Sequence, residues 1–271
     1  MSTTRVLVLG GHGKVALFLQ PLLLAKSWNV TSVVRNPAYE SELLALGKGK
    51  PGKIDVLVDS LDDVKEVSDA RRVLEKVKPD IVVWSAGAGG KGGPARTKAI
   101  DMVAAKCYVS ASLAVPSVKK FLMVSYHASR RGYPPWWTEE DRKAADNTNH
   151  NVLPVYYEAK VEADEHLEAL AKKRLDSGDR EFQAINLRPG TLADKPGTGK
   201  VLLGKTPVAG AVPREDVARV AAALLDRNDT RGWFDLLEGD VPIDEAIDSL
   251  VKSGHNGLEG EDMQRIWGRE T

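Results

Sequence analysis

Three glycines, Gly10, Gly11 and Gly13, are the first residues in the chain whose spacing suggests a ligand. They stand in VLVLGGHGKVALFLQPLL (6–23), between two apolar runs. Gly10 permits a sharp turn, and Gly13 lets the backbone approach a ligand with no side chain in between. The free N–H groups at the start of the helix that follows favour an anion. The spacing predicts a pyrophosphate-binding loop and first helical turn comprising Gly10, Gly11, His12, Gly13, Lys14 and Val15.

The end of the second apolar run indicates which dinucleotide is expected. An acidic residue there would bind the ribose hydroxyls of NAD, but the sequence is TSVVRNP, with Arg35 followed by Asn36. A guanidinium group pairs well with the 2′-phosphate of NADP. The sequence therefore favours NADP(H) as the cofactor, with Arg35 and Asn36 at its 2′-phosphate.

Two later apolar runs also end in candidate nucleotide-binding residues. Asp59 and Ser60 end KIDVLVDS, where the Asp59 carboxylate either reaches the adenine amino group or caps the following helix. The next run ends in WSAGAGGKGG (84–93), where glycines again let the backbone come close to a ligand. This segment adds Ala86, Gly87 and Ala88 to the predicted cofactor site.

The elements that must position these residues alternate along the chain. Apolar runs rich in Val, Ile and Leu, without strict alternation, are typical of strands that are covered on both faces. They lie at 5–10, 29–35, 53–60, 80–87, 119–126 and 182–190, with helical patterns at 41–47, 62–77, about 95–114 and 159–175. This alternation predicts an α/β fold with a doubly wound parallel sheet. Pro21 falls inside the expected first helix, so that helix is either kinked or less regular than predicted.

Composition restricts the remaining possibilities. The 271 residues include 38 basic and 38 acidic ones, so the chain has no global field to attract nucleic acid or an anionic membrane. The single cysteine, Cys107, excludes an internal disulfide and fits a reducing compartment. No apolar run approaches the ~20 residues that span a bilayer. We therefore expect a cytoplasmic protein with no nucleic-acid or membrane partner, and we predict no metal site.

Two segments interrupt the alternation. Residues 127–154 are polar, with Trp136 and Trp137 near the centre, and residues 193–213 are rich in Gly and Pro. Long loops inside a compact α/β domain are usually functional or disordered. We predict a single domain over residues 1–271, with these two segments on the substrate side and a small C-terminal region that covers the substrate. The two tryptophans either cover a substrate or pack against a partner subunit.

The order of these motifs resembles that of the atypical short-chain dehydrogenases/reductases, the NmrA-like or epimerase-like group of NAD(P)-binding Rossmann-fold proteins. The matching pieces are VLGGHGKVA, VVRNP, WSAGAGGKGG, FLMVSY, YYEAKVEAD, LRPGTLADKPGTGKV and REDVA, which together span almost the whole chain. The resemblance implies a Rossmann fold that binds NADP(H). It does not identify a substrate.

The resemblance also implies a catalytic Tyr-x-x-x-Lys pair, matched here by Tyr156 and Lys160. Residues four apart share one helix face, so both side chains can enter one cleft. A nearby ammonium group stabilises the phenolate and brings proton transfer closer to working pH. In the family the lysine also holds the nicotinamide ribose. Tyr157 is a rival for the phenol, because it precedes the same lysine by three residues.

Two further positions follow from the resemblance. The family has a Ser or Thr at the end of the fifth strand that polarises the substrate carbonyl, and here either Ser125 or Tyr126 fills that position. The segment LRPGT matches the family's segment after the sixth strand. Pro189, Gly190 and Thr191 are therefore expected to line the nicotinamide.

The sequence thus predicts an NADP-dependent oxidoreductase that acts on a small carbonyl or quinone-like substrate. One alternative is a redox sensor that binds NADP(H) and signals by a conformational change without turnover. Another is a nucleotide-sugar epimerase or dehydratase, although those enzymes usually carry a larger C-terminal substrate region. A small-molecule substrate is the expected partner, and a homodimer would be typical of the superfamily.

Overall fold

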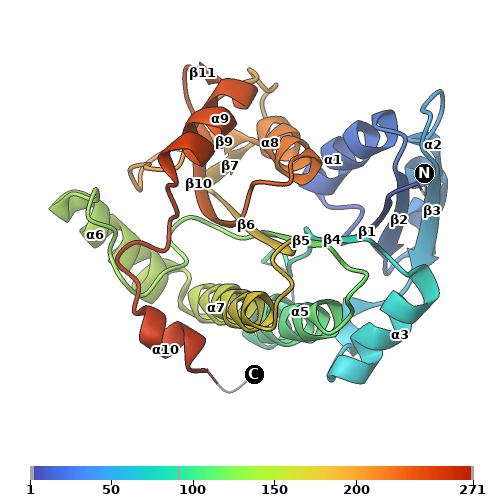
Figure 1. The fold of residues 1–271 in the computed structure, drawn as a ribbon, viewed down its shortest axis with the longest axis horizontal. Coiled ribbons are helices and arrows are strands. Elements are labelled where there is room, and N and C mark those ends of the chain that lie inside the picture. Colours follow the sequence, from blue (N-terminus) through green and yellow to red (C-terminus); the bar gives the residue numbers. More distant parts are fainter. Residues whose placement is uncertain (1–2, 91, 270–271) are drawn as a thin grey trace.

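A mostly parallel β-sheet forms the centre of the protein (Figure 1). The computed structural model describes residues 3–90 and 92–269. Over these residues the strand order is β11-β8-β10-β6-β5-β4-β1-β2-β3. The parallel part contains β1 (Arg5–Leu9), β2 (Asn29–Val34), β3 (Ile54–Val58), β4 (Ile81–Trp84), β5 (Lys120–Val124), β6 (Gln183–Pro189) and β10 (Gly232–Glu238). The predicted doubly wound parallel sheet is confirmed.

Two layers of helices cover the sheet (Figure 1). One layer contains α1 (Lys14–Ala25), α8 (Arg214–Asp226) and α9 (Ile243–Ser253), and the other contains α3 (Val67–Val77), α5 (Ala105–Leu113) and α7 (Pro154–Asp176). A separate apolar core fills the space on each face of the sheet. In the described part of the chain, no helix is both long and apolar enough to cross a membrane.

The six predicted strands are all present, and each ends one to three residues before its predicted limit. The strands are rich in β-branched and leucine side chains that the two helical layers bury, which explains why a continuous apolar run predicted them well. Pro21 does not end the first helix, because α1 continues through it to Ala25.

The helical span predicted near 95–114 is interrupted. It begins as α4 (Gly93–Thr97), continues as a π-helical segment, η3 (Lys98–Ala104), and ends as α5. Such π-turns are rare and are often found at functional sites. Here the π-helical segment carries the buried Asp101.

The two irregular segments of the sequence contain secondary structure. Residues 127–154 include α6 (Glu139–Asp146) and the π-helical η4 (Asn147–Val152), so this segment is not a loop throughout. Helix α6 forms because Thr138 and Asp141 make a capping box at its start. Residues 193–213 include β8 (Lys200–Leu203) and β9 (Ala211–Pro213). Strand β8 extends the main sheet beside β10 and the short β11 (Val241–Pro242), whereas β9 pairs with β7 (Thr191–Ala193).

The two tryptophans join these two segments to each other. The indole N–H groups of Trp136 and Trp137 both donate to the carbonyl oxygen of Thr206, at 3.2 and 3.1 Å. Trp137 is buried in a small cluster with Ala128 and Ala145. Trp137 therefore belongs to the core of this chain.

Candidate active site

The glycine loop lies where β1 and β4 run side by side at the carboxyl edge of the sheet. Gly10 has a φ of +81°, and a Cβ atom there would lie 2.6 Å from Ala86 Cα. A Cβ atom at Gly11 would collide with the buried Ser32 Oγ. Gly13 has an ordinary φ of −68° and lines the clefts on both sides of the loop. Gly10 and Gly11 therefore serve close packing, whereas Gly13 faces the ligand space.

This difference leads to a prediction for two alanine variants. Gly10→Ala should lower the free energy of unfolding by roughly 1–3 kcal/mol, because it combines a left-handed backbone with a clash against Ala86. Gly13→Ala keeps an ordinary φ and brings its methyl group to 3.1 Å from Gly10 O and 3.3 Å from Ser85 O, so it should cost less stability. The loop must shift slightly to relieve these contacts, and this shift should weaken NADPH binding. Urea denaturation and fluorescence titration with NADPH measure the two effects. Equal loss of stability in both variants would contradict the assignment.

The first cleft lies on the β2 side of the loop and has a volume of about 220 Å³. Arg35 and Asp59 line it, as predicted for the adenosine end of a dinucleotide. Asp59 accepts a hydrogen bond from Arg72 at 2.9 Å, and Ser60 caps the short helix η2 (Leu61–Asp63). The cap at this strand end is therefore Ser60. Earlier in the chain, Asn36 caps the short helix η1 (Pro37–Tyr39), because its side-chain oxygen accepts from Ala38 N.

Two residues that the sequence did not point to, Asp62 and Arg96, also line this cleft. Asp62 receives two hydrogen bonds from Arg96, at 2.6 and 3.1 Å, and one from Arg35 at 3.4 Å. The hydrogen bond from Arg96 is the main cause that holds the pKa of Asp62 below its ordinary value. The lining of the cleft therefore includes two guanidinium groups, Arg35 and Arg96, and two carboxylates, Asp59 and Asp62.

The start of α1 carries further polar groups toward the clefts. The His12 ring stacks on Tyr39 with 3.6 Å between ring centroids, and its Nε2 lies 2.9 Å from Glu42. Lys14 Nζ donates to Asp194 at 2.6 Å, and Arg214 donates to the same carboxylate at 2.6 Å. Lys14, Arg214 and Val15 line the second cleft.

The second cleft, with a volume of about 820 Å³, lies across the glycine loop from the first. The two clefts share Gly13 and residues 85–88 as walls, so one extended ligand can occupy both. Ser125, Tyr156 and Lys160 all line the second cleft. The structure thus brings the three predicted catalytic residues to one space, next to the predicted pyrophosphate loop.

Lys160 is almost fully buried, and its ammonium group donates to the Val124 carbonyl oxygen at 3.0 Å. Buried Asp101, on the π-helical segment, accepts from Ala88 N at 3.0 Å. Burial raises the pKa of Asp101, and the positive charge of Lys160 opposes this shift. A Cβ atom at Gly87 would lie 2.9 Å from Asp101 Oδ1, which explains a glycine at that position.

Three tyrosines lie near the cleft, and their hydroxyl groups differ in how they are bonded. Tyr157 Oη donates to the Arg130 carbonyl oxygen at 3.2 Å, and Tyr126 Oη donates to Asn149 Oδ1 at 2.8 Å. Tyr156 lines the cleft, 5.1 Å from the Tyr126 ring between centroids. Burial, together with the negative charges of Asp101 and Asp164, raises the pKa of Tyr156. Its phenol is therefore protonated at neutral pH, and it can act as a proton donor.

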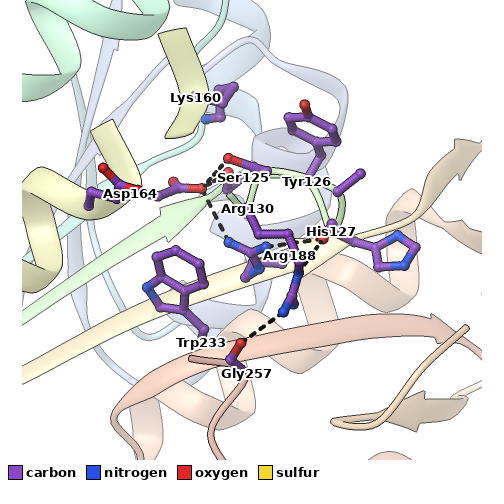
Figure 2. A network of polar contacts seen from close by, with 12 residues as sticks. Ser125, Tyr126, His127, Arg130, Lys160, Asp164, Arg188, Trp233 and Gly257 are labelled. Atoms are coloured by element: carbon purple, nitrogen blue, oxygen red, sulfur yellow. Dashed lines mark hydrogen bonds and ion pairs between the residues drawn. The ribbon is translucent and has the colours of Figure 1, made fainter. Parts of the chain in front are cut away.

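Ser125 is 5% exposed, and Figure 2 shows it beside a buried polar network. Its hydroxyl group donates to Asp164 Oδ2 at 2.6 Å, and the Ser129 hydroxyl donates to the same oxygen at 2.7 Å. Asp164 stands four residues after Lys160 on α7, and no pattern in the sequence indicates this contact. It could have been found only by knowing that α7 crosses the end of β5.

The segment after β6 lies beside the second cleft. Gly190 N donates to Leu236 O at 2.9 Å, and Thr191 N donates to Gly210 O at 3.0 Å. Pro189 is the last residue of β6, and Leu192 is the residue of this segment that lines the second cleft. The predicted contact of Pro189, Gly190 and Thr191 with a nicotinamide stays a prediction.

These residues fit a dinucleotide. Gly13 leaves room for a pyrophosphate at the N-terminus of the twelve-residue helix α1, and Lys14 and Arg214 supply positive charge there. Arg35 and Asp59 would face the adenosine half, and Lys160 would face the nicotinamide ribose. The clefts that these residues line would hold the two halves of the ligand.

Comparison with known proteins also indicates a dinucleotide-binding protein. A protein family described as NAD(P)H-binding matches residues 10–228. The chain is 32% identical over 257 residues to the UPF0659 protein C216.03 of Schizosaccharomyces pombe, covering 93% of this chain and 97% of that protein. It is 30% identical over 249 residues to the uncharacterized sugar epimerase YhfK of Bacillus subtilis, covering 91% and 100%. A putative NAD-dependent epimerase/dehydratase from Bacillus halodurans has a similar structure, with a TM-score of 0.68, 28% identity, and coverage of 91% and 100%.

Proposed function

This chain belongs to the NAD(P)H-binding family, and on that premise we propose that it is an NADP(H)-dependent oxidoreductase for a small carbonyl or quinone-like substrate. The observation that carries the proposal is the shared cleft. Tyr156 and Lys160 line the same space that continues into the glycine loop. A phenol, an ammonium group and a dinucleotide site in one cleft suit hydride transfer coupled to proton transfer.

A reduced nicotinamide bound in this cleft would supply a hydride to a substrate carbonyl carbon. Tyr156 Oη donates the proton that the carbonyl oxygen takes up as the C–O double bond becomes a single bond. Lys160 stands four residues after Tyr156 on α7, and its positive charge would stabilise the phenolate that remains. The Val124 carbonyl oxygen fixes the position of that ammonium group.

The preference for NADPH over NADH is part of the proposal and leads to a prediction. Arg35→Ala should weaken NADPH binding by roughly 10- to 100-fold, because a charge-assisted hydrogen bond to the 2′-phosphate is lost. NADH binding should change little. The matched variant Asp62→Asn should tighten NADPH binding, since it removes a carboxylate that accepts hydrogen bonds from both Arg35 and Arg96. Fluorescence titration of both cofactors measures this, and an equal effect of Arg35→Ala on both would contradict it.

A second candidate function is the epimerase or dehydratase reaction. The names of the relatives from Bacillus subtilis and Bacillus halodurans favour it. Such an enzyme returns the hydride to its product, so it would keep its cofactor and show no net oxidation of NADPH. Nicotinamide nucleotide retained through purification, with no net turnover, would support this candidate over the oxidoreductase.

The redox-sensor alternative is favoured by one contact. The Ser125 hydroxyl hydrogen is engaged by Asp164 and is not free for a substrate carbonyl. A sensor must bind NADPH and NADP⁺ with different affinities, because a ligand shifts an equilibrium only through such a difference. Equal affinities for the two forms would count against this role.

A further inference from the structure

Four buried charged groups form a network next to Ser125: Arg130, Asp164, Arg188 and Asp235. Figure 2 shows three of them, Arg130, Asp164 and Arg188, beside Ser125. Arg188 Nε donates to Asp235 Oδ1 at 2.9 Å, and Arg130 Nη2 donates to Asp235 Oδ2 at 2.5 Å. Arg188 Nη1 also reaches Asp164 Oδ2 at 3.4 Å. The side chains of all four are at most 1% exposed.

Asp164 Oδ2 is an acceptor in this network. It receives three donors, the Ser125 hydroxyl, the Ser129 hydroxyl and the Arg188 guanidinium group. A guanidinium group can only donate, and a carboxylate oxygen that accepts from three donors has no hydrogen of its own to give.

The hydrogen between Ser125 and Asp164 must therefore belong to Ser125. The 2.6 Å contact directs that hydrogen to the Asp164 carboxylate. A hydroxyl group has a single hydrogen and two lone pairs. Ser125 lines the cleft, and its oxygen, with its hydrogen given to Asp164, keeps a lone pair for an acceptor contact.

We propose that Ser125 acts as a hydrogen-bond acceptor toward the substrate, and that Asp164 is the positioning residue that fixes this polarity. The cleft then combines a donor, the Tyr156 hydroxyl, with an acceptor, the Ser125 oxygen. It selects carbonyl compounds that carry an N–H or O–H group next to the carbonyl, such as amides, imides or α-hydroxycarbonyl compounds. The inference rests on the proposed function, in that a substrate carbonyl lies beside Tyr156.

The polarity can be tested with a pair of ligands of nearly equal size. Benzamide and acetophenone share a carbonyl group, but benzamide has an N–H donor where acetophenone has a methyl group. Their affinities would be measured by calorimetry with saturating NADP⁺, which cannot reduce the ketone. Wild type should bind benzamide about three- to tenfold more tightly, the effect of one net hydrogen bond.

Variants of the two serines separate the two polarities. Ser125→Ala should weaken benzamide alone, so that the two affinities become equal. If Ser125 instead donates to the carbonyl, Ser125→Ala weakens both ligands alike, and the inference is overturned. Ser129→Ala is the matched control, because Ser129 donates to the same Asp164 oxygen but is not among the described residues that line the cleft. It should leave the ratio of affinities unchanged.

Asp164 itself is tested by a conservative and a disruptive variant. Asp164→Asn can keep an acceptor oxygen at the position of Oδ2, and the preference for benzamide should survive. Asp164→Ala frees the Ser125 hydrogen, and the preference should shift toward acetophenone. An unchanged ratio in Asp164→Ala would overturn the role of Asp164. Because the readout is binding, a protein that prefers benzamide yet oxidises no NADPH keeps this inference and loses the proposed function.

Discussion

Replacement of Tyr156 by phenylalanine is expected to lower turnover of NADPH by about 10²- to 10⁴-fold and to leave NADPH affinity nearly unchanged. The size of the effect is that of a lost general acid. Phenylalanine keeps the ring, and with it the packing against Tyr126, but lacks the hydroxyl that faces the cleft. Oxidation of NADPH against quinones, aldehydes and ketones measures turnover, and fluorescence titration measures affinity.

Tyr157 offers a matched control for this variant. Its hydroxyl group already donates to the Arg130 carbonyl oxygen and is engaged within the protein. Tyr157→Phe should therefore lower stability slightly and leave turnover within a few-fold of wild type. Full activity in Tyr156→Phe, or an equal loss in both variants, would show that Tyr156 is not the proton donor.

Replacement of Arg188 by methionine is expected to lower the free energy of unfolding by about 3–5 kcal/mol. The change leaves two buried carboxylates, Asp164 and Asp235, with Arg130 as the one remaining cation of the network. Removing one partner of a buried charge network exposes the desolvation cost of the others. The side chain also loses its position over the Trp233 ring, 4.1 Å from the centroid. Urea denaturation followed by far-UV circular dichroism measures the loss.

An exposed ion pair provides the comparison for Arg188. Arg72 pairs with Asp59 at 2.9 Å, and its side chain is 66% exposed. Arg72→Met should change stability by less than about 1 kcal/mol, since water screens a surface pair. Similar losses in the two variants would mean that the buried network is not held by charge.

The strands β1 to β6 and the glycine loop after β1 could be predicted from the sequence, whereas the central strand β10 was missed. Buried parallel strands need continuous apolar runs, and a pyrophosphate loop needs glycine, so local composition carries both signals. Gly10 and Gly13 illustrate this, because the positive φ of the first and the tight backbone surroundings of the second both favour glycine. The resemblance to NAD(P)-binding proteins is confirmed for the same reason: its motifs lie at strand ends, which the chain order fixes.

The polar partners of the site were decided by tertiary structure alone. Asp62 meets Arg96 across 34 residues, Ser125 meets Asp164 across 39, and Arg130 meets Asp235 across 105. In the sequence each of these residues resembles an ordinary polar residue of a helix, loop or strand. A buried hydrogen bond or ion pair depends on distance and desolvation, and only the packing of α7 and the C-terminal strands against the sheet sets these. The apolar pattern thus determined where the cofactor cleft lies, while packing determined which way its polar groups point.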